Sequence, residues 1–438
     1  MGFTELARSN TYGDNVSALW NVSKHDPKLR GAVTEQWTSE SYSFWNNCYI
    51  NKTVMSYRTE LRPNKVFVNL PKHMATHNNL TGVLHERFFT YDSLLNLETE
   101  REKTEGLDKT TTYQYYNNPS PTDANYHIGR PKWEKTVSKV PSAADFWTET
   151  SYTYQNNLLK TEQHRANNSP WVSTTYGYDS FGNPTSKTLS TAGLSSRSEY
   201  FGYSPDGRDM IWHKNVLGLT TSYEYFPYGA LKKETDPYGN STQYTYDGWN
   251  RLHKTTNYLG RVSEVTYAHR SNGGIVKTVN YPNTAPDTRT YYNAWGWTDE
   301  KHVQVSNTQW SKTFYKYDAA GRVTHESIPS FYSPQKWNKT YYDLYGRVSK
   351  MVQANGKVVN TIYDGLRTQV SDGTKTATTT KNALDQIAEL ADPGGTIQYR
   401  YHANGELREA DYGGYVVKTE IDTWGRKSKL IDPTAGTF

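Results

Sequence analysis

The chain has 438 residues, which is enough for two or three ordinary domains or for one large repetitive domain. Hydrophobic residues make up only 35% of it, yet 14% of residues are aromatic and 37 are tyrosines, so both a disordered chain and a thick aliphatic core are disfavoured. The net charge of +5 is small and includes no block of like charges, which argues against a nucleic-acid partner, and no apolar run is long enough to span a membrane.

Residues 1–85 cannot be placed in the repeat that dominates the rest of the chain. We expect them to form divergent repeats or an N-terminal capping element that covers the first open edge of a sheet. The opening residues, MGFTELARSN, lack the apolar core of a signal peptide, so an export signal is not expected within this chain.

Cys48 is the only cysteine, and it lies between Trp45 and Tyr49. A single cysteine excludes an internal disulfide and a cysteine zinc site. Between aromatic neighbours, a small packing residue is favoured over a catalytic nucleophile.

His73 and His77 are four residues apart, the spacing of two metal ligands on one face of a helix. Pro71 precedes them and Asn78 follows, which makes a stable helix doubtful. We therefore favour a solvated loop here, and we expect no metal and no cofactor.

From residue 86 to 438 one short unit recurs: tyrosine, aspartate, two variable residues, glycine, then arginine or asparagine. Successive units start 18 to 25 residues apart, an interval that chance does not sustain over so many copies. Weaker copies start at Tyr91, at Tyr116 with a swollen turn, and at Tyr267. The structural repeat positions of the clearest copies are Tyr178, Asp179, Gly182, Tyr246, Asp247, Arg251, Tyr317, Asp318, Gly321, Arg322, Tyr342, Asp343, Gly346 and Arg347.

Each part of the unit has a structural interpretation. Tyrosines two residues apart, such as Tyr244 and Tyr246, place both rings on one face of a strand. The aspartate begins a tight turn and bonds local backbone N–H groups, the glycine supplies a positive φ, and the arginine starts the return strand. A second kind of turn, with the pattern Asp-Pro-x-Gly as at 236–239, separates several units.

No helix-length apolar periodicity competes with this pattern. The sequence therefore predicts an all-β fold in which repeated β-hairpins build a long antiparallel sheet that twists as it grows, with residues 86–438 as one repeat region.

The units and the Asp-Pro-x-Gly turns resemble the RHS/YD-repeat family, which includes bacterial Rhs polymorphic toxins, the B and C components of insecticidal toxin complexes, and wall-associated and teneurin-like proteins. The resemblance covers roughly residues 85 to 438. It implies that the sheet curls into part of a hollow shell enclosing a toxin polypeptide. It also implies a secreted or cell-surface location and partners such as other parts of the shell, a β-propeller or a delivery component. This sequence carries no recognisable toxic domain or self-cleaving core segment and is short for a closed shell, so we expect a section of shell, a small member or one part of an assembly.

Catalysis and glycan binding are the alternatives to a purely structural role. Most aspartates occupy the turn position, which explains them without a catalytic carboxylate pair, so no enzyme is expected. Exposed aromatic residues such as Trp295 and Trp297 could stack on sugars in an adhesion module. Because the aromatic residues recur in phase, we favour packing between neighbouring repeats.

Overall fold

The computed structural model describes residues 4–9, 19–40, 49–62, 66–123, 125–141, 143–281 and 285–438. These residues form an all-β structure of 36 strands with one short 3-10 turn, η1 (Pro27–Leu29), and no α-helix. None of the described segments is a helix long and apolar enough to cross a bilayer. The predicted fold class, an antiparallel sheet of repeated hairpins, is confirmed.

The strands, in chain order, are β1 (Glu5–Ser9), β2 (Trp20–Asp26), β3 (Ala32–Ser39), β4 (Tyr49–Leu61), β5 (Phe67–Asn78), β6 (Val83–Tyr91), β7 (Leu97–Thr104), β8 (Leu107–Asn118), β9 (His127–Lys139), β10 (Phe146–Gln155), β11 (Leu158–Ala166), β12 (Val172–Tyr178), β13 (Pro184–Thr191), β14 (Leu194–Tyr203), β15 (Met210–Lys214), β16 (Thr220–Tyr225), β17 (Leu231–Thr235), β18 (Ser241–Tyr246), β19 (Leu252–Thr256), β20 (Val262–His269), β21 (Ile275–Asn280), β22 (Thr288–Tyr292), β23 (Thr298–Gln304), β24 (Trp310–Tyr317), β25 (Val323–Ser327), β26 (Trp337–Tyr342), β27 (Val348–Val352), β28 (Val358–Asp364), β29 (Arg367–Ser371), β30 (Thr376–Lys381), β31 (Ile387–Asp392), β32 (Gly395–Tyr401), β33 (Leu407–Tyr412), β34 (Tyr415–Ile421), β35 (Lys427–Asp432) and β36 (Gly436–Thr437).

Each strand pairs antiparallel with the strands before and after it, so the sheet is a single meander. At the N-terminal end β1 pairs with β2, β2 with β3 and β3 with β4, and at the C-terminal end β35 pairs with β36. In the middle, β24 pairs with β23 through residues 310–314 and with β25 through residues 315–317. Residues of 1–85 that the structure describes therefore lie in the same sheet, and the boundary at 85 stays a prediction.

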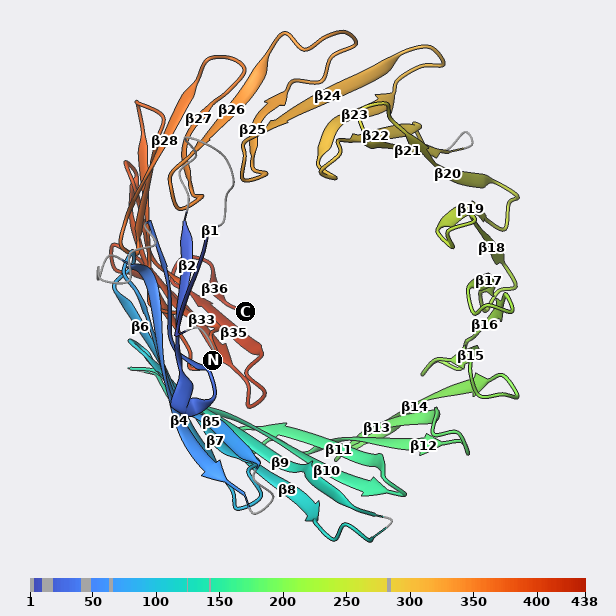
Figure 1. The fold of residues 1–438 in the computed structure, drawn as a ribbon, viewed down its shortest axis with the longest axis vertical. Helices are drawn as coiled ribbons and strands as arrows, with labels where there is room; N and C mark the ends of the chain where they lie inside the picture. Colours follow the sequence, from blue (N-terminus) through green and yellow to red (C-terminus); the bar gives the residue numbers. More distant parts are fainter. Residues whose placement is uncertain are drawn as a thin grey trace.

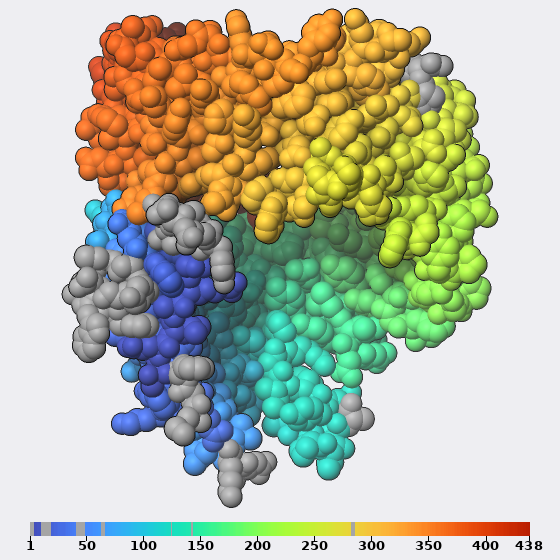
Figure 2. All heavy atoms as spheres, turned by 45° about the horizontal axis from the view of Figure 1, so that its top comes forward, coloured from blue at the N-terminus to red at the C-terminus, as the bar shows by residue number. Residues whose placement is uncertain are grey.

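The twisted strip curls around a hollow centre, and its two ends overlap (Figure 1). The last strands, β28–β36, return beside the first ones. A space-filling view shows the returning strands in orange and red lying over the first strands in blue and cyan (Figure 2). The first and last described strands are not hydrogen-bonded to each other, so the ring is an overlapping spiral and not a closed barrel.

The wall has almost no enclosed core. The buried hydrophobic side chains among the described residues are Val22, Trp37, Ala166 and Ala403. The accessible surface is 27218 Å², whereas a compact monomer of this mass exposes about 17,000 Å². Stability must therefore come from contacts between neighbouring strands, repeated along the strip.

Candidate functional site: the repeat turns and the seam

The repeat turn is a three-residue hairpin loop with a left-handed residue at its end. In the copy at 246–252, the backbone N–H of Asn250 donates to the carbonyl of Asp247 (2.9 Å), and the N–H of Asp247 donates to the carbonyl of Arg251 (2.9 Å). Asn250 has φ +59°, and Gly321 has +78° at the same position of its copy. This geometry is a type I turn followed by a left-handed residue, which explains the recurring glycine.

The turn aspartate holds both the backbone of the turn and the arginine four residues later. In the copy at 317–322, Asp318 Oδ1 accepts from the backbone N–H groups of Ala320 and Arg322, each at 3.0 Å. Its Oδ2 accepts from Arg322 Nε at 2.7 Å. The same pair of contacts joins Asp343 to Arg347, with an Oδ2–Nε distance of 2.7 Å. The sequence predicted the backbone bonds, but it did not reveal the arginine clamp.

This clamp lowers the pKa of the turn aspartates Asp247 and Asp318. Hydrogen bonds from the side chain and backbone of Arg251 lower the pKa of Asp247. In the copy at 178–183 an asparagine replaces the arginine, and Asn183 Nδ2 donates to Asp179 Oδ2 at 3.1 Å. The backbone and side-chain bonds from Asn183 outweigh burial, so the pKa of Asp179 is also lowered. These carboxylates are held ionised, with their oxygens occupied by the turn.

The repeat tyrosine ties its hairpin to the one before it. The hydroxyl of Tyr246 donates to the carbonyl of Leu231 at 2.9 Å. The acceptor in most copies is the first residue of the preceding return strand. Other bonds of this kind include Tyr91 to Pro71 (2.8 Å), Tyr178 to Leu159 (2.7 Å), Tyr225 to Met210 (2.9 Å), Tyr317 to Thr298 (2.7 Å), Tyr342 to Val323 (2.8 Å), Tyr363 to Val348 (3.1 Å) and Tyr401 to Ile387 (2.7 Å).

The clamped arginine completes the connection from the other side. The guanidinium of Arg322 lies over the ring of Tyr342, 4.6 Å from its centroid, and Arg347 lies over Tyr363 at 4.2 Å. In these copies each hairpin is thus joined to the next by a hydroxyl-to-carbonyl bond and by a cation–π contact. The repeat unit acts as a lateral fastener between strands.

Two copies are phased differently from the sequence interpretation. The tyrosine that bonds the previous hairpin in the swollen copy is Tyr115, whose hydroxyl donates to Leu97 at 2.8 Å, and not Tyr116. Near Tyr267 the turn starts at Arg270, two residues later than expected, because β20 continues to His269 without a register shift. The guanidinium of Arg251 still lies over the ring of Tyr267, 4.0 Å from the ring centroid.

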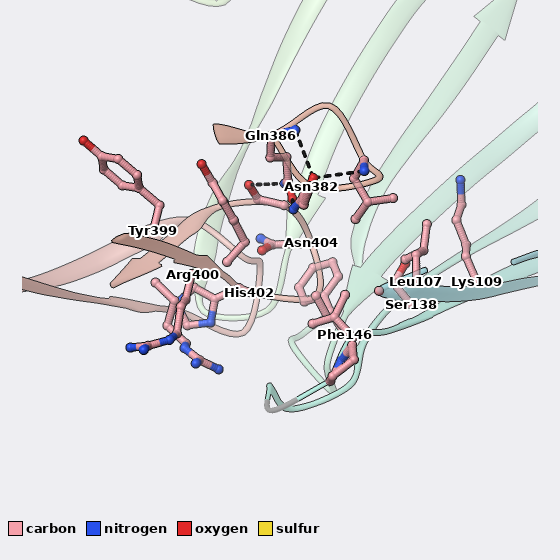
Figure 3. A pocket seen from close by; sticks show the side chains of 18 of the residues that line it. Leu107, Lys109, Ser138, Phe146, Asn382, Gln386, Tyr399, Arg400, His402 and Asn404 are labelled. Carbon is pink, nitrogen blue, oxygen red and sulfur yellow. Dashed lines mark hydrogen bonds between the residues drawn. The ribbon is translucent and has the colours of Figure 1, made fainter. Parts of the chain in front are cut away.

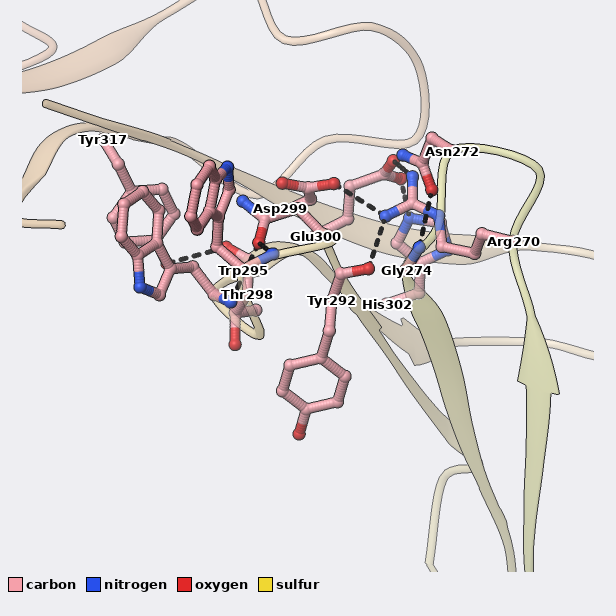
Figure 4. A network of polar contacts seen from close by, with 12 residues as sticks. Arg270, Asn272, Gly274, Tyr292, Trp295, Thr298, Asp299, Glu300, His302 and Tyr317 are labelled. Carbon is pink, nitrogen blue, oxygen red and sulfur yellow. Dashed lines mark hydrogen bonds and ion pairs between the residues drawn. The ribbon is translucent and has the colours of Figure 1, made fainter. Parts of the chain in front are cut away.

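The two candidate glycan-stacking residues, Trp295 and Trp297, sit differently in the turn that follows β22; Trp295 is labelled in Figure 4. Asn293 Oδ1 accepts from the backbone N–H groups of both Trp295 and Trp297 at 3.0 Å. The Trp297 ring packs 5.2 Å from the Tyr317 ring of the next repeat, whereas Trp295 lies at the tip of the turn and is exposed. Only Trp297 has the packing role between repeats.

A polar network lies beside this turn and is also drawn in Figure 4. Arg270 donates to the carbonyl of Tyr292 (3.1 Å) and to Asp299 Oδ2 (2.6 Å). The buried ring of His302 lies 2.9 Å from Glu300 Oε2, and burial lowers the pKa of His302. The network stabilises a turn that has no aspartate of its own.

The predicted loop around His73 and His77 is wrong, because both residues lie within β5. His73 Nε2 lies 3.1 Å from Glu86 Oε1, and its ring stacks on Phe88 at 4.4 Å. No cluster of three metal-binding side chains occurs among the residues that the structure describes. Cys48 and Trp45 lie outside the described residues.

The overlapping ends of the strip meet in a seam, shown from close by in Figure 3. A cavity of about 530 Å³ lies there, lined by Leu107 and Phe146 from the first strands and by Leu384 and Tyr399 from the returning strands. Its side chains come from turns and strand ends, and Figure 3 shows Phe146 between the two sets of strands. The seam packs apolar groups that the open wall exposes elsewhere.

Two further contacts cross the seam. The hydroxyl of Tyr345 donates to Glu40 Oε1 at 2.8 Å, joining residues 305 positions apart. The Phe146 ring lies so close to Gly425 that a methyl group on this glycine would lie 2.9 Å from the ring. These contacts join the two ends of the spiral.

No known family model matches the chain, and no curated protein matches its sequence. Solved structures do match. The crystal structure of TcdB2-TccC3-TEV superposes with a TM-score of 0.72 at 8% identity, over 99% of this chain and 38% of that one. The structure of TcdB2-TccC3 gives 0.68 at 10% identity, over 99% and 33%, and TcdB2-TccC3 without its hypervariable C-terminal region gives 0.68 at 10%, over 99% and 35%. At these identities the likeness shows a shared fold, and this chain spans little more than a third of the chains it matches.

Proposed function

We propose that the chain is a non-enzymatic wall segment of an RHS-type shell that encloses a cargo polypeptide such as a toxin. The observation that carries the proposal is the curl of a single sheet around a hollow centre (Figure 1). The fold shared with the TcdB2-TccC3 complexes and the recurring tyrosine–aspartate turns support it. In this proposal the function is exclusion by a wall, and the repeat positions are the residues that hold the wall together.

The turn chemistry supports a non-enzymatic role. The carboxylate oxygens of Asp247 accept hydrogen bonds from turn N–H groups and from the arginine side chain. The lowered pKa of Asp247 also makes it a poor proton donor near neutral pH. Carboxylates arranged in this way stabilise hairpins.

A fusion experiment tests enclosure. A protease-labile polypeptide is fused after Phe438, which Figure 1 places toward the hollow side of the wall. We expect its half-life under protease to be much longer in the fusion than for the cargo alone. Circular dichroism confirms that the wall is folded in the same sample. Full protease sensitivity of the cargo behind a folded wall would contradict the proposal.

A second candidate is a cell-surface adhesion or glycan-binding module. The exposed ring of Trp295 favours it, because an open indole face can stack on a sugar. Saturable binding on a glycan array, lost in Trp295→Ala and kept in Trp249→Ala, is the expected result for this candidate. Equal binding by both variants, or none by the native chain, would remove it.

A further inference from the structure

The strip has two edges, and they differ in the turns that they carry. The repeat-turn rim carries the turns between an even-numbered strand and the next, such as 247–251, 293–297, 343–347 and 382–386. The spacer-turn rim carries the alternate turns, such as 215–219, 236–240 and 257–261. Because successive turns of an antiparallel meander lie at opposite ends of the strands, these are the two open edges of the wall.

In the seam, the repeat-turn rim of the returning strands packs on the spacer-turn rim of the first strands. Leu384, at the tip of a repeat turn, lines the seam cavity together with Leu107, at the start of β8 after a spacer turn. Tyr345, at the tip of another repeat turn, bonds Glu40, which follows β3 on the spacer side. The seam is therefore one instance, within a single chain, of the repeat-turn rim packing on the spacer-turn rim.

The tip residue is apolar or aromatic in many repeat turns inside and outside the seam, although it is polar at Asp206, Asn272 and Asn404. The exposure of the apolar tips differs between the two regions. Within the overlap Tyr345, Leu384 and Trp424 are only partly exposed. Outside the overlap the apolar tips, two residues after the start of the turn, include Phe181 (63% exposed), Tyr228 (60%), Trp249 (83%) and Trp295 (80%). Large aromatic residues at such exposure are typical of a surface that is covered by a partner.

The spacer-turn rim offers the complementary surface. Leu217, Tyr238 and Leu259 occupy the same tip position in its turns and are 78%, 81% and 56% exposed. A single chain therefore carries both surfaces that pack together in its own seam. Outside the overlap, the repeat-turn rim and the spacer-turn rim are both exposed.

We propose that the exposed repeat-turn rim at Tyr228, Trp249 and Trp295 docks the spacer-turn rim of a second copy of this chain, which continues the seam around the spiral. The contact is heterologous, because one face binds a different face, so copies stack along the spiral axis and lengthen the wall. The inference extends the proposed shell function by naming a partner. Its test involves no cargo, so the two proposals can fail separately.

Sedimentation velocity over a range of protein concentrations tests the proposal. We expect the native chain to form larger species as its concentration rises. Variant A, Trp249→Ser with Trp295→Ser, and variant B, Leu217→Ser with Tyr238→Ser, should each remain monomeric. A mixture of A and B should form 1:1 pairs, because A keeps an intact spacer-turn rim and B keeps an intact repeat-turn rim.

Tyr200→Ser is the matched control, since Tyr200 is an exposed aromatic residue within β14 and away from both rims. It should assemble like the native chain, and circular dichroism establishes that all variants are folded. A native chain that stays monomeric at about 100 µM, assembly by A or B alone, or a mixture that does not pair would each overturn the proposal.

Discussion

The hydroxyl of Tyr246 donates a hydrogen bond to the backbone carbonyl of Leu231, which belongs to the preceding hairpin. The ring of Tyr246 is part of the half-buried face of β18, and its hydroxyl reaches across β17 at the start of that strand. A phenylalanine could fill the same space without making this bond. The recurring tyrosine is therefore explained by its hydroxyl as much as by its ring.

Tyr246→Phe should weaken the contact between two hairpins and leave the rest of the wall intact. Losing one such bond costs about 1 kcal/mol. In a repeat array the effect should stay with nearest neighbours, so hydrogen exchange should accelerate in β16–β19 and not in distant strands. Tyr238→Phe is the control, because Tyr238 is an exposed turn tip. Equal protection of β16–β19 in the native chain and in Tyr246→Phe would show that the bond contributes nothing.

Gly321→Ala should destabilise the protein more than Gly296→Ala. Both glycines have a positive φ, +78° and +81°, which costs an alanine about 1 kcal/mol. At Gly321 the added methyl group would also lie 2.8 Å from the Trp297 ring, whereas at Gly296 nothing lies within 4 Å. Thermal unfolding of the two variants measures the difference. A larger loss in Gly296→Ala would mean that the Trp297 contact is not a packing constraint.

Much of this architecture could be predicted from the sequence, because its signals are local. The spacing of Tyr244 and Tyr246 indicates that both lie on one face of a strand, and Asp247 followed by a residue suited to positive φ indicates the turn. The prediction that Tyr116 is the repeat tyrosine was wrong, because Tyr115 and Tyr116 are adjacent and lie on opposite faces of the strand. The enlarged turn that follows them does not show which of the two tyrosines occupies the repeat position.

Contacts between distant residues could not be predicted in the same way. Phe146 meets Gly425 only because the accumulated twist of the intervening strands brings the ends of the strip together. The partner of each clamped arginine also lies in the next repeat, where Tyr342 receives Arg322. Tyrosine and arginine were both visible in the unit, but nothing in a single sequence linked one copy to the next.

The wall should lose stability in acid below about pH 4. Hydrogen bonds in the turns lower the pKa of several aspartates beneath the unfolded value of about 3.9. A lowered folded pKa contributes stability above the unfolded pKa, and this is lost as the pH falls through the folded pKa. The aspartates concerned are Asp179, Asp236, Asp247, Asp318 and Asp422.

Asp318→Asn gives the matched variant for the acid prediction. Asparagine already occupies this turn position at Asn293 and Asn382, where its oxygen accepts the same backbone bonds. The variant should have a lower melting temperature than the native chain at pH 7. Its melting temperature should fall less than that of the native chain between pH 7 and pH 3. A native chain whose melting temperature is unchanged between these pH values would contradict the prediction.

Alkaline conditions should loosen the same wall through its tyrosines. Burial raises the pKa of Tyr246 and Tyr317, and burial together with Glu134 and Glu162 raises the pKa of Tyr152 to about 12. A raised folded pKa contributes stability that is complete below the unfolded value of about 10 and is lost as the pH rises through the folded value. Ultraviolet titration of tyrosinate should therefore show a late, cooperative step that coincides with loss of the β-sheet signal. Ionisation of all tyrosines near pH 10 with an intact sheet would be inconsistent with this expectation.

Phe146→Ala should open the seam without unfolding the strip. The ring packs against the turn of Gly425 and lines the cavity beside Leu384, so its removal should cost the seam about 2 kcal/mol. The strands on either side keep their own hydrogen-bonded neighbours, so the sheet content should not change. We expect faster hydrogen exchange and proteolytic cleavage in the turns at 402–406 and 422–426, with native behaviour in β16–β24. Phe181→Ala, at an exposed repeat-turn tip outside the overlap, is the control and should leave the seam turns protected. If the seam turns exchange equally fast in the native chain and in Phe146→Ala, the overlap does not hold the spiral, and its diameter must be set by sheet twist alone.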